Sequence, residues 1–194
     1  YGVVRINEAK KIRNLSDKKI LLMQGIYSQD ELFEANELNL DMVIHNSDQF
    51  QILKDNSFYN NLWLKINTGM NRLGFEIKEF LEIYDEYLHD KKFTLMTHLA
   101  ASNDKDSVSN KNQFKLFDDL SKKMNEDVDL SIANTGCIMN FPEYSHDWVR
   151  CGIGIYGGYF KDQEIKTAMT LRSPIVNIRQ IKKGERVGYD GRAE

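Results

Sequence analysis

Short apolar runs alternate with polar, helix-forming segments over most of the chain, and this alternation constrains the fold more than any other feature. The predicted strands are Tyr1–Ile6, Ile20–Gln24, Asp41–His45, Leu62–Ile66, Phe93–His98, Val128–Ala133 and Trp148–Ile153. Because these runs are continuously apolar, they are typical of parallel strands that helices cover on both sides. Strands that alternate with helices predict an α/β fold with a parallel sheet.

The segments between these strands place apolar residues at helical spacing. The predicted helices are Asn7–Asn14, Ser28–Leu38, Ser47–Leu53, Glu76–Leu88 and Val108–Met124. Ser28 is followed three residues later by Glu31, which is the pattern of a capping box. Ser47 is a second N-cap candidate. After the last strand we predict no clear helix, only the polar segment Tyr159–Lys166.

A doubly wound sheet and a (β/α)8 barrel both fit this pattern. No Gly-x-Gly-x-x-Gly fingerprint follows the first predicted strand, which argues against a dinucleotide-binding fold. Polar residues and glycines instead crowd the carboxyl ends of the strands, at Lys65–Gly69, His98, Asn134–Gly136 and Gly152. In a barrel those ends form the rim of the active site.

The pattern changes near residue 160, where we place a domain boundary. Residues 1–160 are predicted to form the barrel, and residues 161–194 the beginning of a β-rich C-terminal domain. Apolar and polar residues alternate from Ile175 to Ile181, as in an antiparallel strand with one solvated face, and Arg186–Tyr189 follows as a second short strand. Both ends of the chain are abrupt, so we expect further sequence upstream and downstream.

The composition excludes several classes of protein. Apolar residues make up 41% and charged residues 28%, as in an ordinary globular protein. A net charge of −3 gives no basic face for nucleic acid, and no apolar run reaches membrane-spanning length. The two cysteines, Cys137 and Cys151, lie in apolar surroundings. We expect both to be buried free thiols, which fits a reducing compartment.

The stretch Asp147–Gly158 joins an apolar run to a glycine-rich end. Gly152, Gly154 and Gly158 let the backbone approach a ligand closely and expose its N–H groups, which makes a natural phosphate cradle. Arg150 lies inside the apolar part, and a buried arginine needs a partner. The stretch alone leaves an alternative open, in which the glycines fit a crowded barrel corner and the arginine pairs with a carboxylate.

Five motifs in a fixed order carry a family resemblance that spans nearly the whole chain. They are Leu64–Phe75, Thr97–Ala100, Ala133–Gly136, Val149–Gly157 and Val187–Tyr189. Together they closely resemble the signature of alanine racemases. The resemblance implies a (β/α)8 barrel that binds pyridoxal 5′-phosphate, a following β domain and a head-to-tail homodimer with shared active sites. It further implies that two bases interconvert L- and D-alanine in the cytoplasm, for peptidoglycan synthesis.

The resemblance also assigns contacts to the cofactor. The hydroxyl of Thr135 would hold the phosphate together with the N–H groups of Gly152 and Ile153. The family usually has serine at the position of Thr135, which follows Asn134. Arg150 would contact the pyridine nitrogen and, because an arginine stays protonated, leave that nitrogen unprotonated. For Asn134–Gly136 a simple turn after a strand remains an alternative, and for Arg150 a structural salt bridge.

Three further side chains are assigned to the site by resemblance. His98 would lie beside the cofactor and bind Arg150, although a satisfied core histidine is equally compatible with its strand. Arg72 would contact the phenolic oxygen of the cofactor and help place the substrate carboxylate. Lys65 matches a lysine that is carbamylated in some members and then holds the arginine, and the alternative is an ordinary snorkelling side chain.

The two bases are the last assignment. Tyr189 matches the tyrosine base that the partner subunit offers, and the alternative is a buried aromatic residue in a hairpin. Asp190 stands where the family commonly has glycine, so the loop shape departs from the family there. The Schiff-base lysine of the family lies on the first barrel strand, and Tyr1–Ile6 matches the second, so the predicted strands are strands two to eight. Lys10 and Lys11 are poor substitutes, and we expect a polypeptide of these residues alone to be inactive.

Two rival functions remain. One is a non-catalytic barrel of the same type that binds pyridoxal phosphate without turnover. Such proteins lack a β domain, so Ala168–Tyr189 favours the racemase. The other is a related decarboxylase or a racemase for another small amino acid. Decarboxylases require an acidic partner for the pyridine nitrogen, so the sequence Arg150–Ile153 favours alanine-type racemases. No metal is expected.

Overall fold

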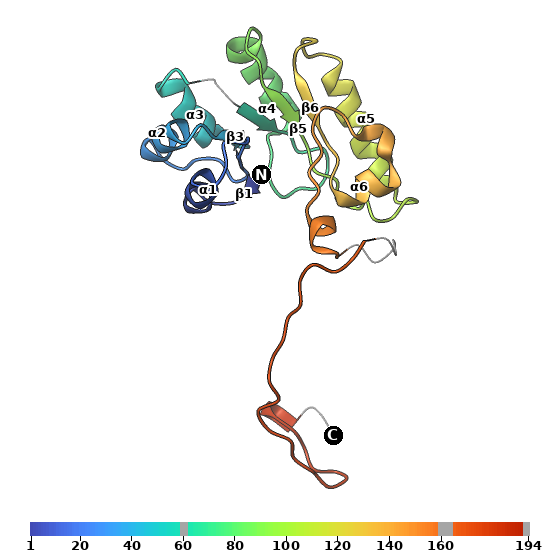
Figure 1. Cartoon of the computed structure of the whole chain (residues 1–194). Helices are drawn as coiled ribbons and strands as arrows, with labels where there is room; N and C mark the ends of the chain where they lie inside the picture. The colour runs from blue at the N-terminus through green and yellow to red at the C-terminus, as the bar shows by residue number, and fades with distance from the viewer. Residues whose placement is uncertain (59–61, 159–164, 192–194) are drawn as a thin grey trace.

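Figure 1 shows a computed structural model of the chain, which describes residues 1–58, 62–158 and 165–191. Six parallel strands form one sheet in chain order. They are β1 (Gly2–Val3), β2 (Leu21–Leu22), β3 (Asp41–Ile44), β4 (Leu62–Lys65), β5 (Thr94–Met96) and β6 (Asp129–Ser131). The helices are α1 (Ile6–Arg13), α2 (Gln29–Glu37), α3 (Ser47–Asp55), α4 (Ile77–Ile83), α5 (Val108–Ser121) and α6 (Thr135–Asn140). A π-helical turn, Tyr84–Leu88, continues α4. The predicted parallel α/β order is confirmed.

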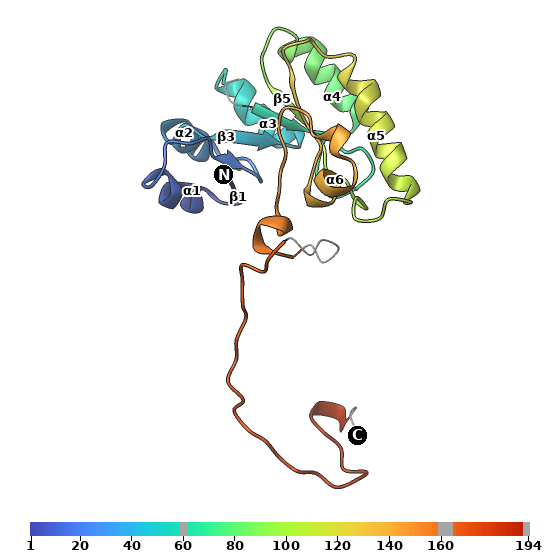
Figure 2. The same cartoon turned by 45° about the vertical axis from the view of Figure 1, so that its right-hand side comes forward.

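The sheet curls into a half-barrel, with α1 to α5 around its outer face (Figure 1, Figure 2). Successive strand residues face opposite sides of a sheet. Leu22, Met42 and Leu64 therefore join the main core with the helices. Residues of the opposite parity, such as Val43 and Trp63, form a second apolar cluster on the concave face. This concave face is the interior of the barrel.

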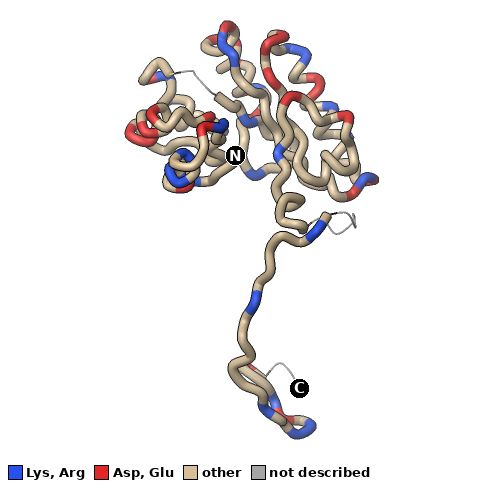
Figure 3. Tube along the Cα trace, viewed as in Figure 1, with Lys and Arg blue, Asp and Glu red and all other residues tan. Residues whose placement is uncertain are grey.

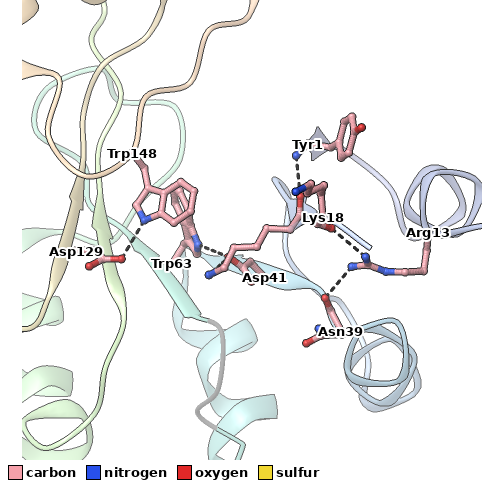
Figure 4. Close-up of polar contacts among 9 residues, drawn as sticks. Tyr1, Arg13, Lys18, Asn39, Asp41, Trp63, Asp129 and Trp148 are labelled. Carbon is pink, nitrogen blue, oxygen red and sulfur yellow. Dashed lines mark hydrogen bonds and ion pairs between the residues drawn. The ribbon is translucent and has the colours of Figure 1, made fainter. Parts of the chain in front are cut away.

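Two tryptophans cross the concave face at the amino ends of the strands (Figure 4). Trp63 Nε1 donates to Asp41 Oδ2 at 3.1 Å, and Trp148 Nε1 donates to Asp129 Oδ2 at 3.0 Å. The two rings lie 5.7 Å apart, and Lys19 Nζ lies 5.2 Å from the Trp148 ring and 3.6 Å from Asp41 Oδ2. A hollow of about 810 Å³ opens beside this group. The pair ties the segment after α6 back to β4, on the side opposite the predicted site.

The prediction of a seventh strand at Trp148–Ile153 is wrong. The structure describes only an isolated bridge there, between Asn134 and Arg150. The carboxylate of Asp147 accepts the Leu130 N–H at 2.8 Å, so a side chain takes one of the main-chain positions that a ladder would need. The remaining bonds are too few and too irregular for a continuous strand. The described sheet is therefore a half-barrel rather than a full barrel.

The predicted strands at Ile175–Ile181 and Arg186–Tyr189 do not form in the described residues. Residues 165–191 extend away from the half-barrel (Figure 1, Figure 2), and Val176 is 93% exposed. Two isolated strands are only marginally stable without a further sheet or helix to cover them. The β-rich domain therefore stays a prediction. The domain boundary near residue 160 and most of the polar segment Tyr159–Lys166 lie outside the described residues.

The local signals at the helix starts are correct in part. Ser28 caps α2 by accepting the Glu31 N–H at 3.2 Å, as predicted. The Glu31 carboxylate completes the turn by accepting the Tyr27 N–H at 2.7 Å, and not that of Ser28. The cap of α3 is Asn46, one residue before the predicted Ser47. Asparagine is an equally good cap, so residue type alone did not fix the start of the helix.

Acidic and basic residues are interspersed along the helices rather than gathered on one basic face (Figure 3). Among the described helices, none combines the length and the hydropathy that a bilayer-crossing segment requires. Both cysteines are free, and Cys137 is buried as predicted. Cys151 is exposed, which corrects the prediction, because it lies in the irregular segment that replaces the seventh strand.

Candidate active site

Strand register brings two of the predicted site residues into one layer of the concave face. Lys65 pairs with Met96 across β4 and β5, and Met96 pairs with Ser131 across β5 and β6. The Ser131 hydroxyl accepts a hydrogen bond from Nη1 of Arg150. Lys65 follows Trp63 by two residues and thus shares its concave side. The layer lies at the carboxyl ends of the strands, where the sequence places the site.

The guanidinium of Arg150 is bound only by neutral oxygen atoms. Nη1 donates to Ser131 Oγ, and Nη2 donates to the carbonyls of Thr97 and Ile132. Nε is buried and has no hydrogen-bond partner, and none of the ion pairs of the described residues includes this arginine. Burial lowers the pKa of Arg150 to about 10, so the side chain is still a cation at neutral pH. The structural salt bridge is therefore not found, and Nε remains free to donate to a ligand.

The predicted loop Asn134–Gly136 is the beginning of α6, a helix that we did not predict. The Asn134 side chain caps it by accepting the Cys137 N–H at 3.1 Å. Ser102 Oγ donates to the same asparagine oxygen at 2.6 Å. The signal was available, because asparagine is a preferred N-cap. A helix of six residues is nevertheless too short for a helical periodicity to be recognised.

Backbone donors gather around Thr135. Its Oγ1 accepts the N–H groups of Gly152 and Gly154, each at 3.2 Å. The N–H of Ile153, between them, has no acceptor among the described residues. Close approach requires glycine at one of these positions, because a Cβ on Gly154 would lie 2.8 Å from Thr135 Cγ2. Neighbouring N–H groups that point to one hydroxyl can also serve a phosphate oxygen.

Burial and the charges of Arg72 and Arg150 act on both Lys65 and His98 and lower the pKa of each. Lys65 is 5% exposed and has no hydrogen bond or ion pair with the described residues. Burial, followed by the charges of Arg72 and Arg150, lowers the pKa of Lys65 to about 8. Burial, followed by the charges of Arg150, Lys65 and Arg72, lowers the pKa of His98 to about 4. A snorkelling lysine would keep its ammonium group in water, so that alternative does not describe Lys65.

Three predicted side chains lack their predicted contacts among the described residues. The His98 ring makes no hydrogen bond to Arg150, because the guanidinium binds the carbonyl of the preceding Thr97 instead. Arg72 is exposed and has no partner among the described residues. Tyr189 is 99% exposed and lies in the extended C-terminal segment, so it is no buried hairpin residue. Within the described residues, no cluster of His, Cys, Asp or Glu side chains is placed to hold a metal ion.

A comparison with protein families decides the relationship. A family model described as "Alanine racemase, N-terminal domain" matches residues 1–160. The chain belongs to the alanine racemase family. The alanine racemase of Shewanella sediminis (strain HAW-EB3) is 34% identical over 202 residues, which cover 97% of this chain and 56% of that protein. The chain therefore spans just over half the length of this curated relative.

Solved structures of alanine racemases share the fold. The alanine racemase from Acinetobacter baumannii is 29% identical, with a TM-score of 0.82, and the match covers 99% of this chain and 57% of that one. The enzyme from Bartonella henselae is described with covalently bound pyridoxal phosphate. It is 22% identical with a TM-score of 0.73 over 86% of this chain and 51% of that one, which shows the fold alone. The half-barrel is thus the racemase N-terminal, TIM-type barrel domain.

Gly154 and Gly152, in the motif Val149–Gly157, are expected to differ in how much stability is lost when each is replaced by alanine. Gly154→Ala should lower the free energy of unfolding by about 1–3 kcal/mol, because the added methyl group collides with Thr135. Gly152→Ala should change it by less than about 0.5 kcal/mol, because no atom lies within 4 Å of the added methyl group. Urea unfolding of both variants measures the difference. Equal losses would show that the glycine contacts described here do not govern the segment.

The lowered pKa of Lys65 predicts a pH dependence of stability. The folded state loses this proton near pH 8 and the unfolded state near pH 10.5, so folding is favoured as pH rises through the folded value. Between about pH 7 and about pH 9 the free energy of unfolding should rise by about 1.4 kcal/mol more in the wild type than in Lys65→Met. Urea unfolding in CO2-free buffer, which keeps the amine unmodified, measures this. Parallel pH curves for the two proteins would contradict the assignment.

Proposed function

We propose that the protein containing this chain is an alanine racemase that uses pyridoxal 5′-phosphate to interconvert L- and D-alanine. One observation carries the proposal. Among the described residues, Arg150, a cation at neutral pH, has no carboxylate beside it and a buried Nε without a hydrogen-bond partner, and it lies next to a segment whose N–H groups gather at Thr135. A ring nitrogen that accepts a hydrogen bond suits the arginine, and a phosphate suits the N–H groups.

The residues present fit this cofactor. The Thr135 hydroxyl and the N–H groups of Gly152 and Ile153 would hold the phosphate, with Asn134 fixing the start of α6. Arg150 would hold the pyridine nitrogen. When bound, the cofactor withdraws electrons from the α-carbon of the amino acid and makes its α-proton acidic. A protonated arginine keeps the ring nitrogen unprotonated and moderates this withdrawal, which favours simple return of the proton over side reactions such as transamination.

The substrate side of the site is built from cations. Arg72 would contact the phenolic oxygen of the cofactor and place the alanine carboxylate, which its planar fork suits. A carbamylated Lys65 would become an anion facing Arg72 and would hold it in place. Carbamylation requires a neutral amine, and the lowered pKa of Lys65 raises the fraction of this side chain that is neutral. His98 would stand beside the cofactor as a neutral ring.

Two bases would exchange the α-proton. Tyr189 would act on one face of the α-carbon, offered from the partner subunit of a head-to-tail homodimer. A lysine outside this chain would act on the other face and would also anchor the cofactor. A tyrosine has an ordinary pKa of about 10, so it needs a cationic neighbour to act as a base. A cation of the partner subunit would supply that neighbour.

The proposal also divides the chain into a barrel part and the beginning of a β domain. Residues 1–160 would supply barrel strands two to eight, and residues 161–194 would open the β domain. Support comes from the side chains of Leu171 and Val176, which are 101% and 93% exposed. Apolar side chains gathered in one segment call for a covering surface. A cytoplasmic location and a role in peptidoglycan synthesis remain predictions.

One assay separates the proposal from its rivals. The full-length protein is expected to bind pyridoxal phosphate and to convert L-alanine into D-alanine, measured by chiral chromatography. Bound cofactor without turnover would point instead to a non-catalytic barrel. Faster conversion of another small amino acid would point to a different racemase. A polypeptide of the 194 residues alone is expected to show no turnover.

A further inference from the structure

Gln113 of α5 joins two chain segments that carry predicted site residues. The side chain is 1% exposed. Its Nε2 donates to Thr68 Oγ1 and to the His98 carbonyl, each at 3.0 Å. Its Oε1 accepts the Ala100 N–H at 2.9 Å. One amide from an outer helix therefore binds both the loop after β4 and the chain after β5.

A series of hydrogen bonds leads from Gln113 into the interior, in which each hydroxyl accepts from the group before it and donates to the next. The Thr97 hydroxyl donates its single hydrogen to the Ile66 carbonyl at 2.9 Å, so in its 2.8 Å contact with Thr68 it accepts. Thr68 thus receives a hydrogen bond from Gln113 and passes one to Thr97. The carbonyl of Thr97 accepts from Arg150. The chain of bonds links Gln113 to the arginine that is proposed to hold the pyridine nitrogen.

The loop that follows Thr68 also contacts Gln113 directly. A Cβ on Gly69 would lie 3.7 Å from Gln113 Cγ, so the backbone of the loop runs across the stem of the glutamine. Arg72 lies three residues further along this loop and has no partner of its own in the described structure. Its position therefore depends on what holds the loop. Asn67 Oδ1 holds the loop from its own start by accepting the N–H groups of Gly69 and Asn71 at 3.1 and 3.0 Å. Gln113 holds it from α5 through Thr68.

We propose that Gln113 is a positioning residue for the racemase reaction, which sets the loop of Arg72 and the strand end of His98 relative to Arg150. The inference rests on the proposed function. Gln113 touches the main chain of His98, but it makes no hydrogen bond to any side chain that is predicted to contact the cofactor. A displacement of about 1 Å in a placing group can lower a rate about 10²-fold, so its loss should matter although it lies outside the site.

Two substitutions and one matched control test this role. Gln113→Ala removes these three hydrogen bonds and a fourth, which Oε1 accepts from Ser109 Oγ at 3.5 Å. Gln113→Glu keeps the length and the acceptor for Ala100, but an ionised carboxylate cannot donate to Thr68 or to the His98 carbonyl. The control is Asn110→Ala on the same helix. Asn110 is also 1% exposed, and its Nδ2 donates to the carbonyls of Ala101 and Asp104 at 3.3 and 2.7 Å. Neither of these two bonds reaches a predicted site residue.

In the full-length holoenzyme, kcat/KM for alanine should fall about 10–10²-fold in both Gln113 variants and less than about 3-fold in Asn110→Ala. All three should melt at lower temperature, so stability alone does not separate them. Gln113→Glu should recover activity toward acidic pH, because a protonated carboxyl can donate again, and burial raises the pKa at which it does so. Neither the wild type nor Asn110→Ala should show this recovery.

A readout independent of turnover is amide hydrogen exchange in the protein without cofactor. The amides of Gly69, Asn71 and Ala100 should exchange faster in Gln113→Ala than in Asn110→Ala. Equal exchange and equal kcat/KM in the two variants would overturn the proposal and leave Gln113 a packing residue. If the wild type does not racemise alanine, the proposed function fails, and the exchange rates still decide whether Gln113 orders the loop.

Discussion

Tyr189→Phe in the full-length protein is expected to lower alanine racemisation by about 10²–10⁴-fold in both directions, the usual cost of removing a general base. Every turnover needs a base on each face of the α-carbon, so racemisation should slow down in both directions. The substitution keeps the ring and removes only a hydroxyl group, so packing should barely change. The free energy of unfolding should therefore fall by no more than about 1–2 kcal/mol, the scale of one lost hydrogen bond.

Proton exchange should separate the two faces in the same variant. With D-alanine the remaining base can remove and return the α-proton, so deuterium from the solvent should enter without inversion. With L-alanine, whose proton faces Tyr189, this exchange should be nearly abolished. Proton NMR in deuterated buffer measures both rates. Tyr87→Phe is the control, because it removes a hydroxyl that bonds Lys54 and Glu86 on the outer surface. Equal exchange of both enantiomers would make Tyr189 a packing residue.

The order of the fold was readable from the sequence because burial leaves a periodic trace. Helices such as α5 begin at the predicted residue, since their apolar positions recur at helical spacing. Strand lengths were overestimated, as at β5, where Phe93–His98 was predicted and Thr94–Met96 forms. An apolar run reports burial, whereas a strand ends where its ladder of hydrogen bonds ends. The prediction of a strand at Trp148–Ile153 is wrong for the same reason.

The site was readable only where a residue type is costly to bury or hard to replace. A cation inside an apolar run marked Arg150, and clustered glycines marked the segment beside Thr135. The role of Gln113 carried no such signal. A single glutamine within a polar helix is typical of a solvated face, and only the tertiary contacts show that this one is buried. The bond from Arg150 to the Thr97 carbonyl, in place of the His98 ring, likewise depends on backbone placement.

Arg150→Lys is expected to lower racemisation by about 10²–10³-fold, the scale for loss of one preorganised charged donor. A lysine keeps the charge but lacks the planar fork that reaches Ser131 and Thr97 while leaving Nε free. Arg13→Lys is the matched control (Figure 4). Like Arg150, Arg13 binds only neutral oxygen atoms, among them the carbonyls of Lys18 and Asn39 at 2.9 and 3.0 Å, but it belongs to α1 on the outer face. The Arg13→Lys variant should be less stable than the wild type and should keep its racemase activity.

Arg150→Glu distinguishes an electronic role from a merely structural one. A carboxylate at this position would keep the pyridine nitrogen protonated, because a nearby negative charge favours the charged form of a base. Stronger electron withdrawal by the ring should then raise the side reaction, so pyruvate should form from alanine while racemisation falls. Arg150→Met, which removes the charge without adding an opposite one, should lose racemisation and form less pyruvate. If Arg150→Glu and Arg150→Met lose racemisation equally and neither forms pyruvate, Arg150 serves only to hold Ser131 and Thr97 in place.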